Sequence, residues 1–333
     1  MTDESDAKPA AQVELDAQVK PGAQVKPGAQ VKPAAKHKKS NALLNVMIAI
    51  SAIAMIGALG LIAYPTFSDW WNRMHQSYAV AGYVEQTKDM SGAERKAMLK
   101  AAHEYNERLA ANGDRWHMTD AQKREYDETL DVTGTGIMGY VTIPRIKVKL
   151  PVYHGTSDGV LQIAAGHLAG TSLPVGGATT HAVVSGHTGL PSARLLTGLD
   201  ELKKGDTFAF HVLDETYTYQ VDQISVVLPS EISKLNIESG ADYATLITCT
   251  PYGVNSHRLL VRGHRIPNPK VPDKTQYDEP GEMTAVAAAV IGLLVFVAGC
   301  AFVGLARLWR RSWIVRHGLC AGAGARHSSG VRG

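Results

Sequence analysis

Two long runs of apolar residues frame a central region in which apolar and polar positions alternate. The runs, at 42–64 and 283–306, contain 23 and 24 residues without a charged side chain. A helix needs about 20 apolar residues to cross the hydrocarbon core of a bilayer. A buried helix of a soluble domain would show a polar face, and neither run has one. The pattern therefore predicts two transmembrane helices, at 41–64 and 283–306.

Basic residues flank both predicted spans on the same side of the membrane. They are Lys36, Lys38 and Lys39 before the first span, and Arg307, Arg310, Arg311 and Arg316 after the second. Such flanks remain in the cytoplasm, so we expect both termini inside the cell and the region between the spans outside. The long segment before the first span favours an uncleaved signal anchor over a cleaved signal peptide.

Three segments outside the membrane lack the periodicity of folded elements. Residues 1–40 contain a six-residue repeat, Ala-Gln-Val-Lys-Pro-Gly, which cannot bury a core. We predict a disordered cytoplasmic tail there, with a passive spacer as the simplest role and a partner-binding tail as the alternative. Residues 269–282 are predicted to be a linker, and residues 307–333 a basic cytoplasmic tail.

The region between the spans changes from helical to β periodicity. Residues 65–135 are predicted to form a helical stalk, with a capping box at Ser91–Glu94 opening one helix. Residues 136–268 form the main domain, in which short alternating segments are punctuated by Gly, Pro and Asp. This texture predicts a mainly β barrel or sandwich. The predicted strands are 139–143, 147–150, 182–185, 207–212, 217–227, 244–249 and 258–265.

Charge and cysteine usage narrow the class of protein. The balance of 34 basic and 31 acidic residues argues against a nucleic-acid partner. Three cysteines cannot build a disulfide framework, because Cys300 falls in the second apolar run and Cys320 beyond it. Cys249 is then the single thiol outside the membrane. An unpaired thiol in that place points to a membrane-tethered cysteine enzyme.

Cys249 has candidate partners in nearby turns and loops. The turn formers Pro251, Gly253 and Asn255 are expected to reverse the chain and bring Arg258 back beside the cysteine. His187 follows an apolar segment and enters a Gly/Pro loop, which is a common location for catalytic groups. A cysteine nucleophile needs such a base or cation, and acyl transfer needs a group that holds the oxyanion.

These residues lie within motifs that resemble the sortase family. Thr245-Leu246-Ile247-Thr248-Cys249 matches the sortase signature Thr-Leu-x-Thr-Cys, and the extension through Leu259 resembles class C, the pilin-polymerising sortases of Gram-positive bacteria. Further blocks that resemble the family are 139–144, 150–155, 172–177 and 185–187. The resemblance covers roughly residues 70–266, and a carboxy-terminal span is usual for the class.

The resemblance implies a fold, an active site and a reaction. The fold would be an eight-stranded sortase β-barrel, with an N-terminal helical stalk and two flanking transmembrane helices. Cys249 would be the nucleophile, His187 the acid/base, and Arg258 the group that steadies substrate or oxyanion. Such enzymes cut a Leu-Pro-x-Thr-Gly-like sorting signal after Thr and, in class C, join it to a pilin lysine. Pilin subunits and membrane lipid would be the partners, and no metal or organic cofactor is implied.

The resemblance also suggests a lid over the active site. Class C sortases carry Asp-Pro-aromatic in a loop that plugs the site, and this chain has Asp114-Arg115-Trp116 before the barrel. Asp114 would approach Arg258, and Trp116 would cover Cys249. Arg115 replaces the proline, which removes a fixed backbone angle and adds a charge.

Simpler interpretations stand beside these. Cys249 could be an inert cysteine at a strand end, and the lid residues an ordinary helix-end Asp and an interfacial Trp. Five other histidines share no metal-ligand spacing and are interpreted as structural: His154, His167, His181, His257 and His264. Alternative functions are a sortase that anchors proteins to peptidoglycan, an extracellular cysteine protease, and a non-catalytic surface module.

Overall fold

The computed structural model describes residues 42–270, 277, 288–289, 291–304 and 306–307. The repeat tail at 1–40, most of the linker, Cys320 and almost all of the basic tail therefore lie outside the described residues. Part of the second apolar run is described, as a helix over Ile291–Gly304. Within the described residues, one helix is long and apolar enough to cross a membrane, over Leu43–Asp89. The second predicted span remains a prediction.

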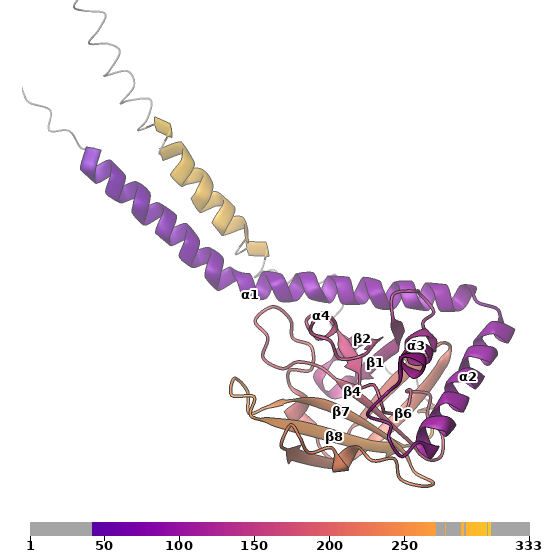
Figure 1. Ribbon diagram of the computed structural model, residues 1–333. Coiled ribbons are helices and arrows are strands. Elements are labelled where there is room, and N and C mark those ends of the chain that lie inside the picture. The colour runs from indigo at the N-terminus through magenta and orange to yellow at the C-terminus, as the bar shows by residue number, and fades with distance from the viewer. Residues whose placement is uncertain (1–41, 271–276, 278–287, 290, 305, 308–333) are drawn as a thin grey trace, which may run out of the picture. The chain divides into compact units, whose positions relative to one another are not determined.

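The central region is a closed barrel of eight strands, which confirms the predicted fold class (Figure 1). Around the barrel the order is β1-β2-β3-β4-β7-β8-β6-β5. Neighbours are antiparallel except for β2–β3 and β4–β7, which are parallel. The strands are β1 (Ile137–Ile143), β2 (Val148–His154), β3 (Ala165–His167), β4 (Thr180–Ser185), β5 (Thr207–Val212), β6 (Glu215–Val227), β7 (Asp242–Thr250) and β8 (His257–Arg265).

Alternation along the strands fills the barrel with apolar side chains. In β5, Phe208, Phe210 and Val212 are buried, and the residues between them are half-buried. The ring centres of Phe208 and Phe210 lie 6.0 Å apart, with the ring planes at 83°. Tyr219 on β6 stacks on Phe208. Such aromatic groups contribute both buried area and directional contacts to a core. The period of two in β5 thus reflects burial on one face of the strand.

Besides the helix over Ile291–Gly304, four helices accompany the barrel in the described part of the chain. They are α1 (Ala42–Asp89), α2 (Gly92–Ala111), α3 (Asp120–Glu128) and α4 (Asp158–Leu161), and three short 3₁₀ turns are η1 (Pro144–Ile146), η2 (Leu199–Glu201) and η3 (Ser233–Leu235). The predicted capping box starts α2, with Ser91 Oγ accepting from the Glu94 N–H and the Glu94 carboxylate accepting from the Ser91 N–H. The predicted span continues without a break into the next helical segment, although Pro65 lies inside α1.

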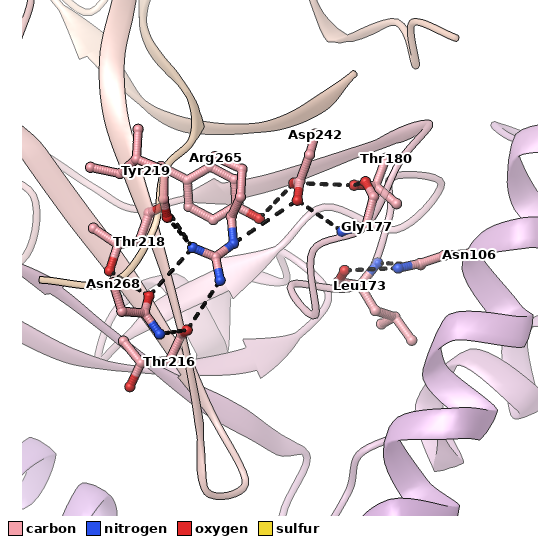
Figure 2. Close-up of polar contacts among 11 residues, drawn as sticks. Asn106, Leu173, Gly177, Thr180, Thr216, Thr218, Tyr219, Asp242, Arg265 and Asn268 are labelled. Atoms are coloured by element: carbon pink, nitrogen blue, oxygen red, sulfur yellow. Dashed lines mark hydrogen bonds and ion pairs between the residues drawn. The ribbon is translucent and has the colours of Figure 1, made fainter. Parts of the chain in front are cut away.

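The helices of the predicted stalk are packed on the barrel. Tyr83 of α1 donates a hydrogen bond to the Met138 carbonyl at 3.1 Å and accepts one from the Leu213 N–H at 2.7 Å. Asn106 of α2 is buried, and its amide exchanges two hydrogen bonds with the backbone of Leu173 (Figure 2). A free stalk would leave these groups in water. Residues 65–135 are therefore partly integrated into the barrel domain.

The end of the barrel at which β7 begins is held by a polar network around Asp242 (Figure 2). The Asp242 carboxylate accepts hydrogen bonds from the Gly177 N–H at 2.8 Å, the Tyr219 hydroxyl at 3.0 Å and the Thr180 hydroxyl at 3.3 Å. The Arg265 Nε lies 4.0 Å from the Asp242 carboxylate. Burial raises the pKa of Asp242, and these partners oppose that rise. The network fixes the start of β7, and Cys249 lies near the other end.

Candidate active site

Cys249 and Arg258 lie opposite each other on adjacent strands. They are direct partners in the antiparallel register of β7 and β8. Side chains of opposed residues share one face of the sheet, with Cβ atoms about 4.5–5.5 Å apart. The predicted turn joins them, since the N–H groups of Val254 and Asn255 both donate to the Pro251 carbonyl. Cys249 is half-buried and carries a free thiol.

His187 reaches the same place from β4. This strand runs parallel to β7, with Ser185 beside Ile247. The Gly186 N–H then donates to the Ile247 carbonyl at 3.0 Å, so the pairing continues past the end of β4. His187 and Cys249 each lie two residues after the Ser185–Ile247 pair. His187, Cys249 and Arg258 therefore form a row across β4, β7 and β8, which we call the catalytic row because these are the predicted catalytic residues.

The catalytic row lies on the outer face of the barrel. Val184, Leu246 and Leu259 belong to the buried core, so their side chains point into the barrel. The residues next to each of them on its strand point outward. Because side chains alternate between the two faces of a strand, Cys249 and Arg258 point outward. The row is thus open to a substrate that approaches the outside of the sheet.

The side chains of the catalytic row have few partners. Arg258 donates from Nη1 to the carbonyls of Asn255 and His257, at 3.2 and 3.1 Å. Its Nε and Nη2 donors make no such bond in the described part of the chain. Neither the His187 ring nor the Cys249 thiol has a side-chain hydrogen bond among the described residues. An arginine has five N–H donors, so donors remain for a substrate carbonyl.

Thr248, Gly186 and Gly189 hold the row together. The sequence analysis did not predict a role for them. The Thr248 hydroxyl donates to the Gly186 carbonyl at 2.8 Å, which ties the residue before the cysteine to the residue before the histidine. A Cβ at Gly186 would lie 2.8 Å from buried Leu196. A Cβ at Gly189 would lie 2.8 Å from the Tyr252 ring, so the loops after His187 and Cys249 touch there. Gly186 and Thr248 belong to the quoted motifs, whereas Gly189 lies two residues beyond one of them.

An apolar cluster covers the sheet beside the row. It contains Val183, Leu235, Ile247 and Leu260, with Trp116 packed against it. Ile247 lies opposite Leu260. This pair is two residues from the Cys249–Arg258 pair along each strand, so both pairs lie on the same face of the sheet. Trp116, from the segment between α2 and α3, therefore lies next to the row.

Arg115 fixes this segment on the barrel. Its guanidinium is buried, donates to the carbonyls of Gly170 and Leu235 at 3.0 and 2.9 Å, and lies 4.4 Å from the centre of the Trp116 ring. Burial lowers the pKa of the Arg115 guanidinium. Asp114 is exposed and accepts a hydrogen bond from His117 at 2.7 Å. In the described part of the chain, the structure shows no hydrogen bond or ion pair between Asp114 and Arg258.

His181, a histidine outside the row, fills a structural position. The buried His181 ring donates from Nδ1 to the Asn236 carbonyl at 2.8 Å and pairs through Nε2 with the Thr245 hydroxyl at 2.7 Å. Burial lowers the pKa of His181, which favours this neutral form. Among the described residues, no group of three His, Cys, Asp or Glu side chains is arranged to hold a metal ion. A cavity of about 380 Å³ lies between α2 and α3, and no residue of the catalytic row lines it.

Comparison with protein families places this site within a known domain. Residues 141–266, which include the whole catalytic row, match the model of the sortase domain. Sortase A of Streptococcus agalactiae is 30% identical over 117 residues, which are 34% of this chain and 47% of that protein. The chain thus spans about half the length of that curated relative.

Solved structures match over longer stretches. Sortase C1 of Streptococcus agalactiae is 52% identical with a TM-score of 0.57, and the match covers 58% of this chain and 100% of that one. Sortase C of Clostridium perfringens, solved with a C-terminal cell wall sorting motif, is 40% identical with a TM-score of 0.51. That match covers 58% of this chain and 100% of the other.

Proposed function

The chain belongs to the sortase family, and from this premise we propose that it is a membrane-anchored cysteine transpeptidase. Cys249 is the nucleophile, His187 the acid and base, and Arg258 the donor that holds the substrate carbonyl or oxyanion. The observation that carries the proposal is the catalytic row, in which the end of β4 and the distant β7–β8 hairpin bring these side chains to one outward face.

The reaction follows from the chemistry of the row. The Cys249 thiol gives its proton to His187 and attacks the carbonyl carbon of Thr in a sorting signal. The bond from that carbon to the Gly nitrogen breaks, and the leaving amine takes the proton from His187. A thioester remains on Cys249. An incoming amine then attacks the thioester, an amide bond forms, and its proton returns through His187 to the sulfur.

The Arg258 guanidinium assists at the point where negative charge develops. A tetrahedral intermediate places charge on the former carbonyl oxygen, and a preorganised cationic donor stabilises it. Nη1 is already bound to two backbone carbonyls, which orients the planar group. Nε and Nη2 then supply the donors toward the substrate.

We propose a Leu-Pro-x-Thr-Gly-like sorting signal as the donor and a pilin lysine as the acceptor. The first part is supported by the similar Clostridium perfringens sortase C, which was solved with a cell wall sorting motif. The second is supported by the Pro251–Asn255 extension of the motif and by the class C names of the similar structures. The alternatives are a peptidoglycan amine as acceptor, hydrolysis by water, and a non-catalytic surface module.

Asp114–Trp116 is proposed as the lid of this site. Support comes from Trp116, which packs beside the row, and from Arg115, whose three hydrogen bonds attach the segment to the barrel. Buried Arg115 thus replaces the restraint that proline would give. The long apolar helix α1 supports a membrane anchor with the barrel outside the cell. A second span and two cytoplasmic termini complete this topology as proposals.

Product analysis tests the function. The full chain in detergent is incubated with a sorting-signal peptide and either a lysine peptide or a glycine-ended amine, and the products are identified by mass. We expect a lysine-linked product from the wild type and from Cys300→Ala, and none from Cys249→Ala.

Each other outcome has its own meaning. A product formed only with the glycine-ended amine would favour peptidoglycan anchoring, and free acid alone would favour hydrolysis. Trp116→Ala is expected to speed the reaction by opening the lid. Absence of any product from both the wild type and Trp116→Ala would contradict the enzymatic proposal.

A further inference from the structure

A row of cations follows the outer side of η1 and β2. Residues 145–150 alternate cationic and apolar side chains. The apolar members of this segment are buried in the core, so the cationic members face outward. Arg145 and Lys147 are exposed, and Lys149 is half-buried with its Nζ 5.6 Å from the centre of the Tyr140 ring. In the described part of the chain, neither Lys147 nor Lys149 has an ion-pair partner.

Two arginines from other segments extend this row. Arg73 of α1 and Arg194 of the loop after β4 line one small cavity of about 30 Å³ together with Lys147 and Lys149. The Asp69 carboxylate lies 3.0 Å from the Arg73 Nε and accepts from the Arg194 N–H. We call Arg73, Arg145, Lys147, Lys149 and Arg194 the basic face. Together they place five positive charges on this side of the barrel.

An aromatic group on α1 marks the level at which this helix would leave the membrane. Phe67, Trp70 and Trp71 form a cluster with ring centres 5.8 to 6.4 Å apart, and Phe67 and Trp71 are exposed. Exposed aromatic side chains of this kind are typical of the interface between lipid and water. The cluster begins three residues after the apolar run ends at Tyr64.

The basic face lies just beyond this level. Arg73 follows Tyr64 by nine residues in the same helix, which is about 13 Å at 1.5 Å per residue. The headgroup layer occupies roughly 5–8 Å of that distance, and the Debye length is about 8 Å at physiological salt. The barrel is attached to this same stretch of α1, since Asn72 donates to the Ser192 carbonyl at 2.8 Å and Gln76 to the Ile163 carbonyl at 2.7 Å.

We propose that the basic face binds the phosphate groups of anionic phospholipids and so docks the barrel on the membrane surface. The proposal rests on the membrane anchoring of α1 proposed above. The membrane partner is favoured by charge complementarity and by the continuity of the basic face with the helix that would cross the bilayer. Docking would restrict the directions from which substrates reach the barrel.

Lysine labelling in nanodiscs tests this proposal. The full chain is placed in discs of phosphatidylcholine, alone or with phosphatidylglycerol, and treated with an amine-reactive acetyl ester, and each site is quantified by mass. A surface potential near −30 mV raises the local proton concentration about threefold and reduces the reactive neutral amine by the same factor. We expect Lys147 and Lys149 to label at least about threefold more slowly in anionic discs, with full recovery in high salt.

Lys96 provides the control within the same molecule. It is an exposed residue of α2, beyond the far end of α1, and no ion pair involves it in the described part of the chain. Its labelling should not depend on the lipid. Arg145→Glu should reduce the protection of Lys147 and Lys149, whereas Lys96→Glu, which changes net charge equally, should not.

Three outcomes would overturn the proposal. Equal slowing at Lys96 and Lys147 would indicate a general surface potential, and equal labelling in both lipids would indicate no contact with anionic headgroups. Failure of the chain to co-elute with discs would instead overturn the anchoring and, with it, the docking. The first two outcomes, in a chain that co-elutes with the discs, would overturn the docking alone.

Discussion

Strand β7 carries Asp242 at its first residue and Cys249 one residue before its last, and the surroundings of these two side chains differ. Asp242 accepts hydrogen bonds from three groups on three segments and lies near Arg265. Cys249 has no side-chain hydrogen bond among the described residues and is half-exposed. A buried polar group needs its partners to be stable, whereas a catalytic group needs some of its capacity free for substrate.

Strand β8 repeats this contrast with its two terminal arginines. Arg265 donates to the carbonyls of Thr216, Thr218 and Ile266, and so closes the base of the barrel (Figure 2). Arg258, at the other end, is bound only to carbonyls of its own turn. The difference indicates that the end with Asp242 and Arg265 supports the barrel, whereas the end with Cys249 and Arg258 presents the reactive groups. The predictions that follow are ways to separate these two roles.

The largest effect is expected at the catalytic end. His187→Ala should lower the rate of acyl transfer by about a thousandfold or more, because it removes the proton carrier. The melting temperature should change little, since the His187 ring makes no hydrogen bond in the described structure. Rates and thermal unfolding would be measured on the same preparation. A large loss of stability with the rate per folded molecule unchanged would contradict the assignment.

A histidine buried in the barrel should make the stability of the protein depend on pH. His167 is fully buried, donates from Nε2 to the Ser172 carbonyl, and has its pKa lowered by burial from 6.5 to about 4. The folded protein then binds a proton less readily than the unfolded chain. Its stability is fully present above pH 6.5 and should fall by roughly 3 kcal/mol as the pH drops toward 4.

The free energy of unfolding as a function of pH measures this effect. His167→Gln should be less stable than wild type at neutral pH but should show a flatter dependence between pH 6.5 and 4. An equally steep dependence in the variant would mean that other groups cause it.

A smaller loss is expected at the base of β7. Asp242→Ala leaves the Gly177 N–H and the Tyr219 hydroxyl without their acceptor, which should cost about 2 kcal/mol after allowance for the relieved burial of a carboxylate. Asp214→Ala is the matched control, because it removes an exposed salt bridge with Arg95 worth about 0–1 kcal/mol. Urea unfolding would measure both variants. A lowered rate per folded molecule in Asp242→Ala would show that the two ends are coupled.

Local patterns made much of this architecture predictable. Seven of the eight strands, the capping box at Ser91 and the turn that returns Arg258 to Cys249 follow from alternation and turn residues in short windows. Strand β3 has only three residues, too few to show a period. The continuation of α1 beyond the predicted span could not be predicted from the sequence. Apolar composition favours a helix in its first half, whereas its second half is stabilised by packing on the barrel.

Contacts between distant residues could not be predicted from the sequence. Arg115 was noticed as a departure from the motif, but its acceptors at Gly170 and Leu235 lie 55 and 120 residues away. The partners of Asp242 likewise come from three other segments. For the same reason, Thr248 was recognised as part of a signature without its bond to Gly186, which depends on the parallel pairing of β4 and β7.

Alkylation of Cys249 tests the central claim, that the catalytic row acts as one unit, without knowledge of the substrate. The rate of modification by iodoacetamide at neutral pH would be followed by peptide mass in wild type, His187→Ala, Arg258→Ala and Arg262→Ala. Arg262 is a matched control on β8, where it pairs with Asp222. Each chain would be tested with and without Trp116→Ala, so that shielding by the lid is recognised.

The thiolate is the reactive form, and neighbouring cations favour it. We expect Cys249 to react at least about tenfold faster in wild type than in His187→Ala or Arg258→Ala, and Arg262→Ala to match wild type. Equal rates in all four chains, with Trp116 present or replaced, would contradict the account.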